Sequence, residues 1–142
     1  MKIKNRDKLY IYYRDNKRCF YCEKKLKYKQ MTLDHYLPRS SGGIDEIFNL
    51  VVSCKRCNRD KGDTIPIDVY EIMLILFLQG VKDGKITGKD IDISNRELKK
   101  YLLEVEKVEG LNREIVFQSK DKRFYIKDGY VNKMIHFGGK KH

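Results

Sequence analysis

Two pairs of cysteines are the residues of this chain best suited to hold a metal ion. Cys19 and Cys22 form the first pair and Cys54 and Cys57 the second, each with two residues between its members. A turn of this spacing directs two thiolates at one ion, and two such turns complete a tetrahedral zinc site. Because protein ligands fill all four positions, the sequence predicts a structural zinc that contributes on the order of 10 kcal/mol to folding.

Polar residues between and after these pairs have the chemistry needed to hydrolyse a phosphodiester. Asp34 and His35 are adjacent, and Asn58 follows the last cysteine. Neutral imidazole can take a proton from water. Carboxylate and amide oxygens suit Mg²⁺ or Mn²⁺, which would bind the scissile phosphate. Lys61 shares a helix face with Asn58 and is expected to touch phosphate. Neighbours on a regular strand face opposite sides, so Asp34 and His35 converge only if the strand bends or ends there.

The two ends of the chain are basic. Residues 1–30 carry eleven Lys or Arg and three acids, a net +8, and residues 111–142 carry eight and three, or +5. Residues 31–63 are neutral overall and residues 64–110 have a net charge of −2. Basic blocks attract polyanions, although a lysine-rich run can also be a solvated surface that only aids solubility. Beside a candidate phosphodiesterase site we favour nucleic acid, with expected DNA contacts at Lys24, Lys25, Lys27, Lys29 and Arg39.

The elements that must position these residues follow from the hydrophobic pattern and the turn signals. The pattern predicts a helix over 5–16, a strand over 31–37, a loop over 38–43, a strand over 50–52 and a helix over 54–62. The cysteine pairs therefore bracket a strand, a long loop and a second strand, and the second pair opens the helix.

The break at residues 64–66 predicts a boundary between a first domain, 1–63, and an accessory α+β region, 64–142. The accessory region contains no recognised chemical motif. Its role is left open, with contact to DNA as one option. Its pattern predicts a helix over 68–80, a turn or hairpin over 80–90, a helix over 94–108, and two or three strands within 113–137.

The chain lacks the marks of export or membrane insertion. No basic leader with an apolar stretch opens it, and its longest apolar run, 72–78, is far shorter than the roughly 18 residues of a span. These features predict a soluble cytoplasmic protein with no membrane partner, in which the thiols stay reduced and can bind metal.

Taken in order, the motifs resemble the HNH endonuclease family. They are the two cysteine pairs, Leu33-Asp34-His35, Pro38, Ser41-Gly42-Gly43, Asn49-Leu50, Asn58 and Lys61-Gly62-Asp63. The resemblance covers about residues 5–63 and implies a ββα-metal fold around one catalytic ion. It implies that His35 is the general base, that Asp34 is a metal ligand and that Asn49 braces the loop. Asn58 stands where the family often has His, which favours Mg²⁺ over metals that prefer imidazole.

We therefore predict an α+β protein with a ββα-metal HNH fold and zinc knuckles, followed by a small α+β region. The expected function is a metal-dependent endonuclease that nicks or cuts duplex DNA, of phage, mobile-element or restriction type. A non-catalytic zinc module that binds nucleic acid explains the cysteines and the charge equally well. It gives no reason for Asp34, His35, Asn49 and Asn58 to fall together at the family's positions. A zinc-linked redox or assembly protein has only the cysteine pairs in its favour.

Overall fold

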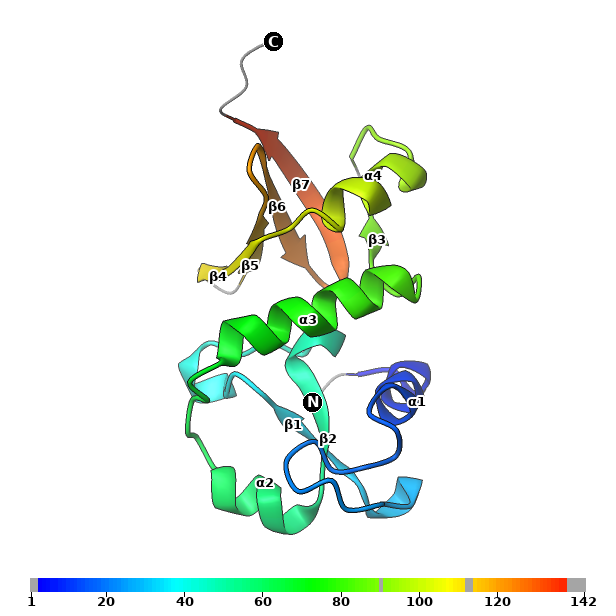
Figure 1. Ribbon diagram of the computed structural model, residues 1–142, viewed down its shortest axis with the longest axis vertical. Coiled ribbons are helices and arrows are strands. Elements are labelled where there is room, and N and C mark those ends of the chain that lie inside the picture. Colours follow the sequence, from blue (N-terminus) through cyan, green and yellow to red (C-terminus); the bar gives the residue numbers. More distant parts are fainter. Residues whose placement is uncertain (1–2, 90, 112–113, 138–142) are drawn as a thin grey trace. The chain divides into compact units, whose positions relative to one another are not determined.

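A computed structural model describes residues 3–89, 91–111 and 114–137 of the chain (Figure 1). It divides into two compact units, Met1–Val69 and Tyr70–His142. The described residues form four α-helices, a two-stranded sheet and a five-stranded sheet, which confirms the α+β class. The separate roles predicted for residues 1–63 and 64–142 stay predictions. The described residues leave out 1–2, 90, 112–113 and 138–142. These belong to the predicted basic ends of the chain and to the turn predicted over 80–90.

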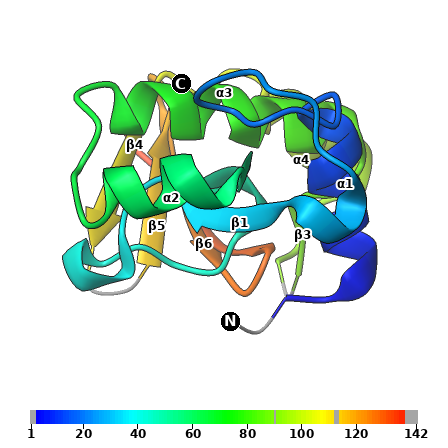
Figure 2. The same ribbon diagram turned by 90° about the horizontal axis from the view of Figure 1, so that it is seen from below.

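The first unit contains the predicted strand–loop–strand–helix order. Strand β1 (Thr32–His35) pairs antiparallel with β2 (Leu50–Ser53), so that Thr32 lies opposite Ser53 and His35 opposite Leu50. Helix α2 (Lys55–Lys61) follows directly, with Cys54 as its N-cap, and runs beside β1 in Figure 2. Because β2 and α2 are joined without a loop, the hairpin and the helix form one rigid ββα element.

Helix α1 (Asn5–Arg14) is attached to this element by a buried ion pair at its C-terminal end. Arg14 Nε donates to Asp15 Oδ1 at 2.9 Å, and its Nη atoms donate to the carbonyl oxygens of Ile47 and Leu50, both at 2.6 Å. Asp15 Oδ2 in turn accepts the backbone N–H of Val52 at 2.9 Å. The pair thus satisfies backbone groups of β2 and of the 3-10 turn that precedes it, as a buried charge pair must to be tolerated.

The second unit packs helices on a mostly antiparallel sheet. Helix α3 (Val69–Lys82) opens it, followed by β3 (Thr87–Gly88) and α4 (Asn95–Leu102). Strands β4 (Lys107–Leu111), β5 (Glu114–Gln118), β6 (Lys122–Lys127) and β7 (Tyr130–His136) complete the sheet in the order β3-β7-β6-β5-β4. The described residues contain no helix long and apolar enough to cross a membrane.

Three boundaries in this unit differ from the sequence predictions. Helix α3 continues past Gly80 to Lys82, and the range 80–90 contains β3, which pairs in parallel with β7 instead of forming a hairpin. The helix predicted to reach Val108 ends at Leu102, and β4 follows. Val105 and Val108 continue the apolar spacing of the helix, but pairing of Val108 with Phe117 across the sheet makes residues 107–111 a strand.

Candidate active site and metal centre

The four cysteine sulfurs converge although they come from two separate turns. Their Sγ atoms all lie within 4.8 Å of one another, and the Sγ atoms of Cys22 and Cys54 are 4.0 Å apart. Four sulfurs at about 2.3 Å from a tetrahedral zinc would be about 3.8 Å apart. The arrangement is therefore close to that of a zinc site and could hold a metal ion.

The thiol pKa values show opposed shifts within this cluster. Burial raises the pKa of the Cys19 thiol, but hydrogen bonds from the backbone of Cys22, Cys54 and Tyr21 outweigh it together and lower that pKa to about 6. The pKa of Cys57 is raised to about 12, first by its hydrogen bond with the Cys54 side chain and then by burial. Close thiols resist ionising together, and a divalent cation among them would stabilise all four as thiolates.

Asp34 is buried, with 7% of its surface exposed, and its carboxylate links three elements. Its Oδ2 accepts a hydrogen bond from the hydroxyl of Tyr21, which lies inside the first cysteine turn. The ammonium of Lys61, at the end of α2, lies 3.2 Å from the same oxygen. Burial, and next the hydrogen bond to Asp34, raise the pKa of Tyr21, so its hydroxyl stays a neutral donor. The first cysteine turn and α2 thus both hold Asp34 in place.

Asn58 meets β1 on the face that carries Asp34. Its Nδ2 donates to Thr32 Oγ1 at 3.1 Å, and residues 32 and 34 share a face because side chains alternate along a strand. Lys61, one helical turn after Asn58, contacts Asp34 from the same side. The strand–helix contact therefore brings the two predicted metal ligands to one surface. The Asn58 carbonyl oxygen accepts no hydrogen bond from the described residues.

His35 is the last residue of β1, and its ring turns to the loop that follows. Its Nε2 lies 2.6 Å from Asp45 Oδ1, with both side chains partly exposed. Lys61 Nζ donates to the His35 carbonyl oxygen at 3.0 Å. The side chains of Asp34 and His35 thus have different partners, as alternation along the strand predicts. The phosphate contact predicted for Lys61 stays a prediction, since its ammonium here bonds to internal oxygens.

Asn49 closes the loop between the two strands. It has no exposed surface, its Oδ1 accepts the N–H of Leu37 at 2.8 Å, and its Nδ2 donates to the carbonyl oxygens of Leu37 and Ile44 at 3.2 and 3.0 Å. Gly43 makes this closure sterically possible, because a Cβ there would lie 1.7 Å from the Leu37 carbonyl oxygen. The closed loop carries Asp45 back to His35, a contact that supports the bracing role expected for Asn49.

The predicted DNA-contacting residues are all exposed. Lys24, Lys25, Lys27 and Lys29 follow the first cysteine turn, and Arg39 lies in the short 3-10 helix Arg39–Ser41. Two site residues went unnoticed in the sequence, Tyr21 and Asp45. The only feature of the nearby sequence that points to Asp45 is its position shortly after Gly42-Gly43. Nothing in the nearby sequence distinguishes Tyr21 from Phe20, the other aromatic residue of the first cysteine turn.

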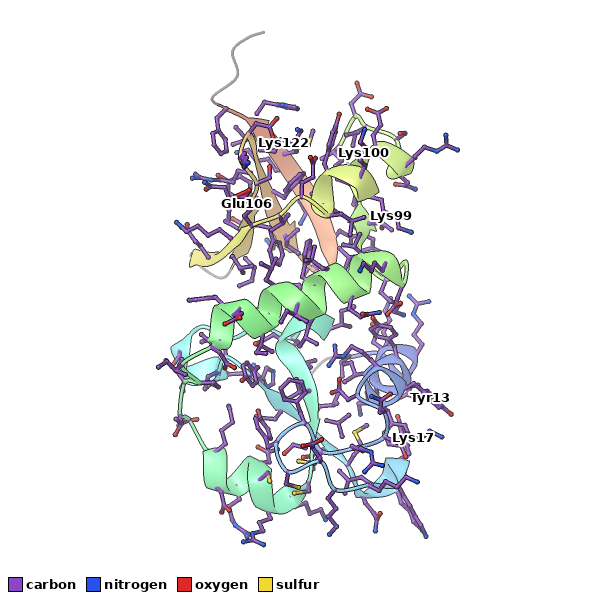
Figure 3. All side chains as sticks on the ribbon, viewed as in Figure 1. Tyr13, Lys17, Lys99, Lys100, Glu106 and Lys122 are labelled. Atoms are coloured by element: carbon purple, nitrogen blue, oxygen red, sulfur yellow. The ribbon has the colours of Figure 1, made fainter. Side chains whose placement is uncertain are left out.

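Replacing Tyr21 with phenylalanine tests the link between knuckle and carboxylate. Loss of a hydrogen bond to a buried charge should lower the free energy of unfolding by about 1–2 kcal/mol, measured by chemical denaturation of the zinc-loaded chain. Tyr13→Phe is the matched control, because Tyr13 is 59% exposed and points away from α1 (Figure 3). Equal stability of both variants would contradict the link.

Comparison with known proteins agrees with this geometry. Residues 19–70 match the family model described as HNH endonuclease. A 52-residue segment is 38% identical to the CRISPR-associated endonuclease Cas9 of Corynebacterium diphtheriae and covers 36% of this chain and 5% of that protein. A 73-residue segment is 36% identical to the enzyme of the same name from Actinomyces naeslundii, covering 49% of this chain and 6% of that protein. The chain thus spans a small fraction of the length of these relatives.

Proposed function

We propose that this chain is a metal-dependent endonuclease that hydrolyses phosphodiester bonds of duplex DNA, because residues 19–70 match the HNH endonuclease family model. The observation that carries the proposal is the ββα element itself. It holds the His35–Asp45 pair at the end of β1, one residue after Asp34, which lies on the strand face that Asn58 meets. A scaffold that only bound nucleic acid would need neither a carboxylate-oriented imidazole nor a buried acid.

His35 is the proposed general base. With Asp45 accepting the Nε2 proton, Nδ1 is the ring nitrogen that takes a proton from water. The water oxygen forms a bond to phosphorus while the bond from phosphorus to the leaving oxygen breaks. Asp45 keeps the ring in this tautomer and stabilises the imidazolium that results. Asn49 acts as a positioning residue, because it holds the loop that carries Asp45.

Asp34 and Asn58 are the proposed ligands of Mg²⁺ or Mn²⁺. Two contacts support this assignment. The Lys61 ammonium lies 3.2 Å from Asp34 Oδ2, so this oxygen already accepts a positive charge. Thr32 bonds only to the nitrogen of the Asn58 amide, which leaves the amide oxygen to bind a metal ion. A bound divalent ion would neutralise the scissile phosphate and stabilise the leaving oxygen. The separate four-cysteine cluster is the proposed zinc site and has no coordination position left for substrate.

The exposed basic residues near the first cysteine turn are the proposed contacts that hold DNA on the protein. Lys24, Lys25, Lys27 and Lys29 would contact phosphates, which adds affinity without sequence preference. Arg39 would do so from the loop beside His35. We further propose nicking or double-strand cutting in the cytoplasm, in a phage, mobile-element or restriction setting.

Cleavage of supercoiled plasmid with Mg²⁺, with Mn²⁺ and with EDTA tests the proposal. We expect cutting in the two metal arms only, and loss of roughly 10²-fold or more in Asp34→Ala and Asn58→Ala, since metal stabilisation of the leaving group is worth several kcal/mol. Asp60→Ala is the control, an exposed acid on the same helix whose nearest cations are 3.9 Å away.

Zinc content must match the wild type in all three variants, and each must be folded at the assay temperature. Asp34→Ala is expected to unfold at a lower temperature than the wild type, because it removes the Tyr21 hydrogen bond and the Lys61 ion pair. Asp34→Ala protein that is folded, zinc-loaded and as active as the wild type would overturn the assignment of the catalytic metal.

A further inference from the structure

The five-stranded sheet of the second unit has one face covered by its own helices. Phe77 of α3 stacks on Phe117 of β5 with ring centroids 3.6 Å apart, and Lys122 of β6 lies 4.1 Å from the ring centroid of Tyr101 in α4. Both helices therefore pack on the face that contains Phe117 and Lys122 (Figure 1). No described helix of residues 70–137 contacts the opposite face, which we call the outer face.

The strand register determines which residues form the outer face. Arg123 pairs with Gln118 and Ile135, Tyr125 with Lys133, and Lys127 with Tyr130. Residues directly opposite each other share a face, and alternate residues along β6 return to it. The described side chains of the outer face are Thr87, Lys107, Glu109, Glu114, Val116, Gln118, Arg123, Tyr125, Lys127, Tyr130, Lys133 and Ile135, with Lys89 beside Tyr130. Its two acids, Glu109 and Glu114, lie on β4 and β5.

Uncompensated positive charge is concentrated on β6 and β7 of this face. Lys127 and Lys133 are exposed and make no ion pair with a described carboxylate. Glu109 is already paired with Lys107 at 2.7 Å. Arg123 donates to Gln118 Oε1 at 3.0 Å, and its buried Nε finds no acceptor among the described residues. The lysines are therefore free to neutralise an external anion.

Tyrosines alternate with these cations. The Lys133 ammonium lies 5.2 Å from the ring centroid of Tyr125, and the Lys89 ammonium lies 5.0 Å from that of Tyr130. Such contacts order the flexible lysine side chains over the sheet. Ordered lysines and tyrosine hydroxyls are donors that bind phosphate oxygens in protein–DNA complexes. A second copy of this face would meet it with like charge, which disfavours self-association.

We propose that the outer face of this sheet binds the phosphate backbone of duplex DNA as a second contact surface, separate from the residues that cut. The inference rests on the proposed function for its choice of duplex DNA. It adds a role for the second unit, for which the sequence contains no motif. Lys127 of β6 and Lys133 of β7, which have no carboxylate partner among the described residues, are its principal phosphate contacts.

The test compares two lysine pairs of equal charge within the same unit. Lys127→Gln/Lys133→Gln removes the outer-face pair, and Lys99→Gln/Lys100→Gln removes two exposed lysines of α4 (Figure 3). Both are made in His35→Ala protein, so that binding is measured without cutting. Affinity for a duplex oligonucleotide, and for its single strand, is then measured across a salt series.

In the Lys127→Gln/Lys133→Gln variant, we expect the slope of log affinity against log salt for the duplex to become smaller in magnitude by roughly 2. Each lost phosphate contact accounts for about 0.9 of this change. The same variant should bind the duplex about tenfold or more weakly at low salt. The Lys99→Gln/Lys100→Gln variant should keep the slope of the His35→Ala protein. Equal slopes in the two pairs, or a loss confined to the single strand, would overturn the proposal. An intact outer-face effect in a wild-type chain that does not cut DNA would instead reject the proposed nuclease function alone.

Discussion

Replacing His35 with alanine is expected to lower the rate of DNA cleavage by roughly 10²-fold or more, while the affinity for DNA stays within about twofold. General-base catalysis contributes about 10²–10⁴-fold in typical enzymes, and His35 is the imidazole that Asp45 orients at the end of β1. The rate is measured on supercoiled plasmid with saturating Mg²⁺. The affinity is measured on a duplex oligonucleotide without the catalytic metal.

His136→Ala is the matched control, because His136 is an exposed histidine in β7. Asp45→Asn should give a smaller loss, about tenfold, since the imidazole remains but its proton is no longer held by a carboxylate. A His35→Ala enzyme that cuts at the wild-type rate would show that another group activates the water.

Substituting Cys54 by serine should unfold residues 1–69 at ordinary temperature. Zinc held by four thiolates contributes on the order of 10 kcal/mol to folding, which is comparable to the whole stability of a typical domain. Circular dichroism and elemental analysis of zinc would report the loss together. Wild-type protein stripped with a strong chelator should lose the same structure and regain it when zinc is restored.

Cys22→Ser separates metal binding from packing. Cys54 is buried and Cys22 is exposed, so loss of packing alone predicts a large effect for the first and almost none for the second. Zinc ligation predicts comparable unfolding of both, because each supplies one of four sulfurs within 4.8 Å. Folded, active protein that contains no zinc would reject the structural zinc site.

Much of the first unit follows from local sequence. Alternating and buried apolar runs predicted β1 and β2, and the second cysteine pair marked the start of α2, which the structure confirms within one or two residues. The HNH resemblance is confirmed for residues 19–70. These features depend on short-range patterns: strand alternation, a helix cap and the spacing of ligands in a turn.

The second unit was less predictable because its strands depend on distant partners. Residues 107–111 have the composition of a helix end, yet they pair with β5 as β4. Two residues, Thr87 and Gly88, form β3 only because β7 offers them an edge. Strand formation reflects neighbours across the sheet more than intrinsic preference.

The sequence by itself determined which chemical groups are present and in what order: four thiols for a tetrahedral ion, an imidazole beside a carboxylate, and an amide on the helix that the second cysteine pair begins. Only the tertiary structure decided their partners. Tyr21 and Lys61 meet at Asp34, and Asp45 meets His35, at sequence separations of 10 to 27 residues. Such contacts exist because the loop closed by Asn49 and the packing of α2 on β1 bring these segments together, and no spacing rule along the chain encodes that closure.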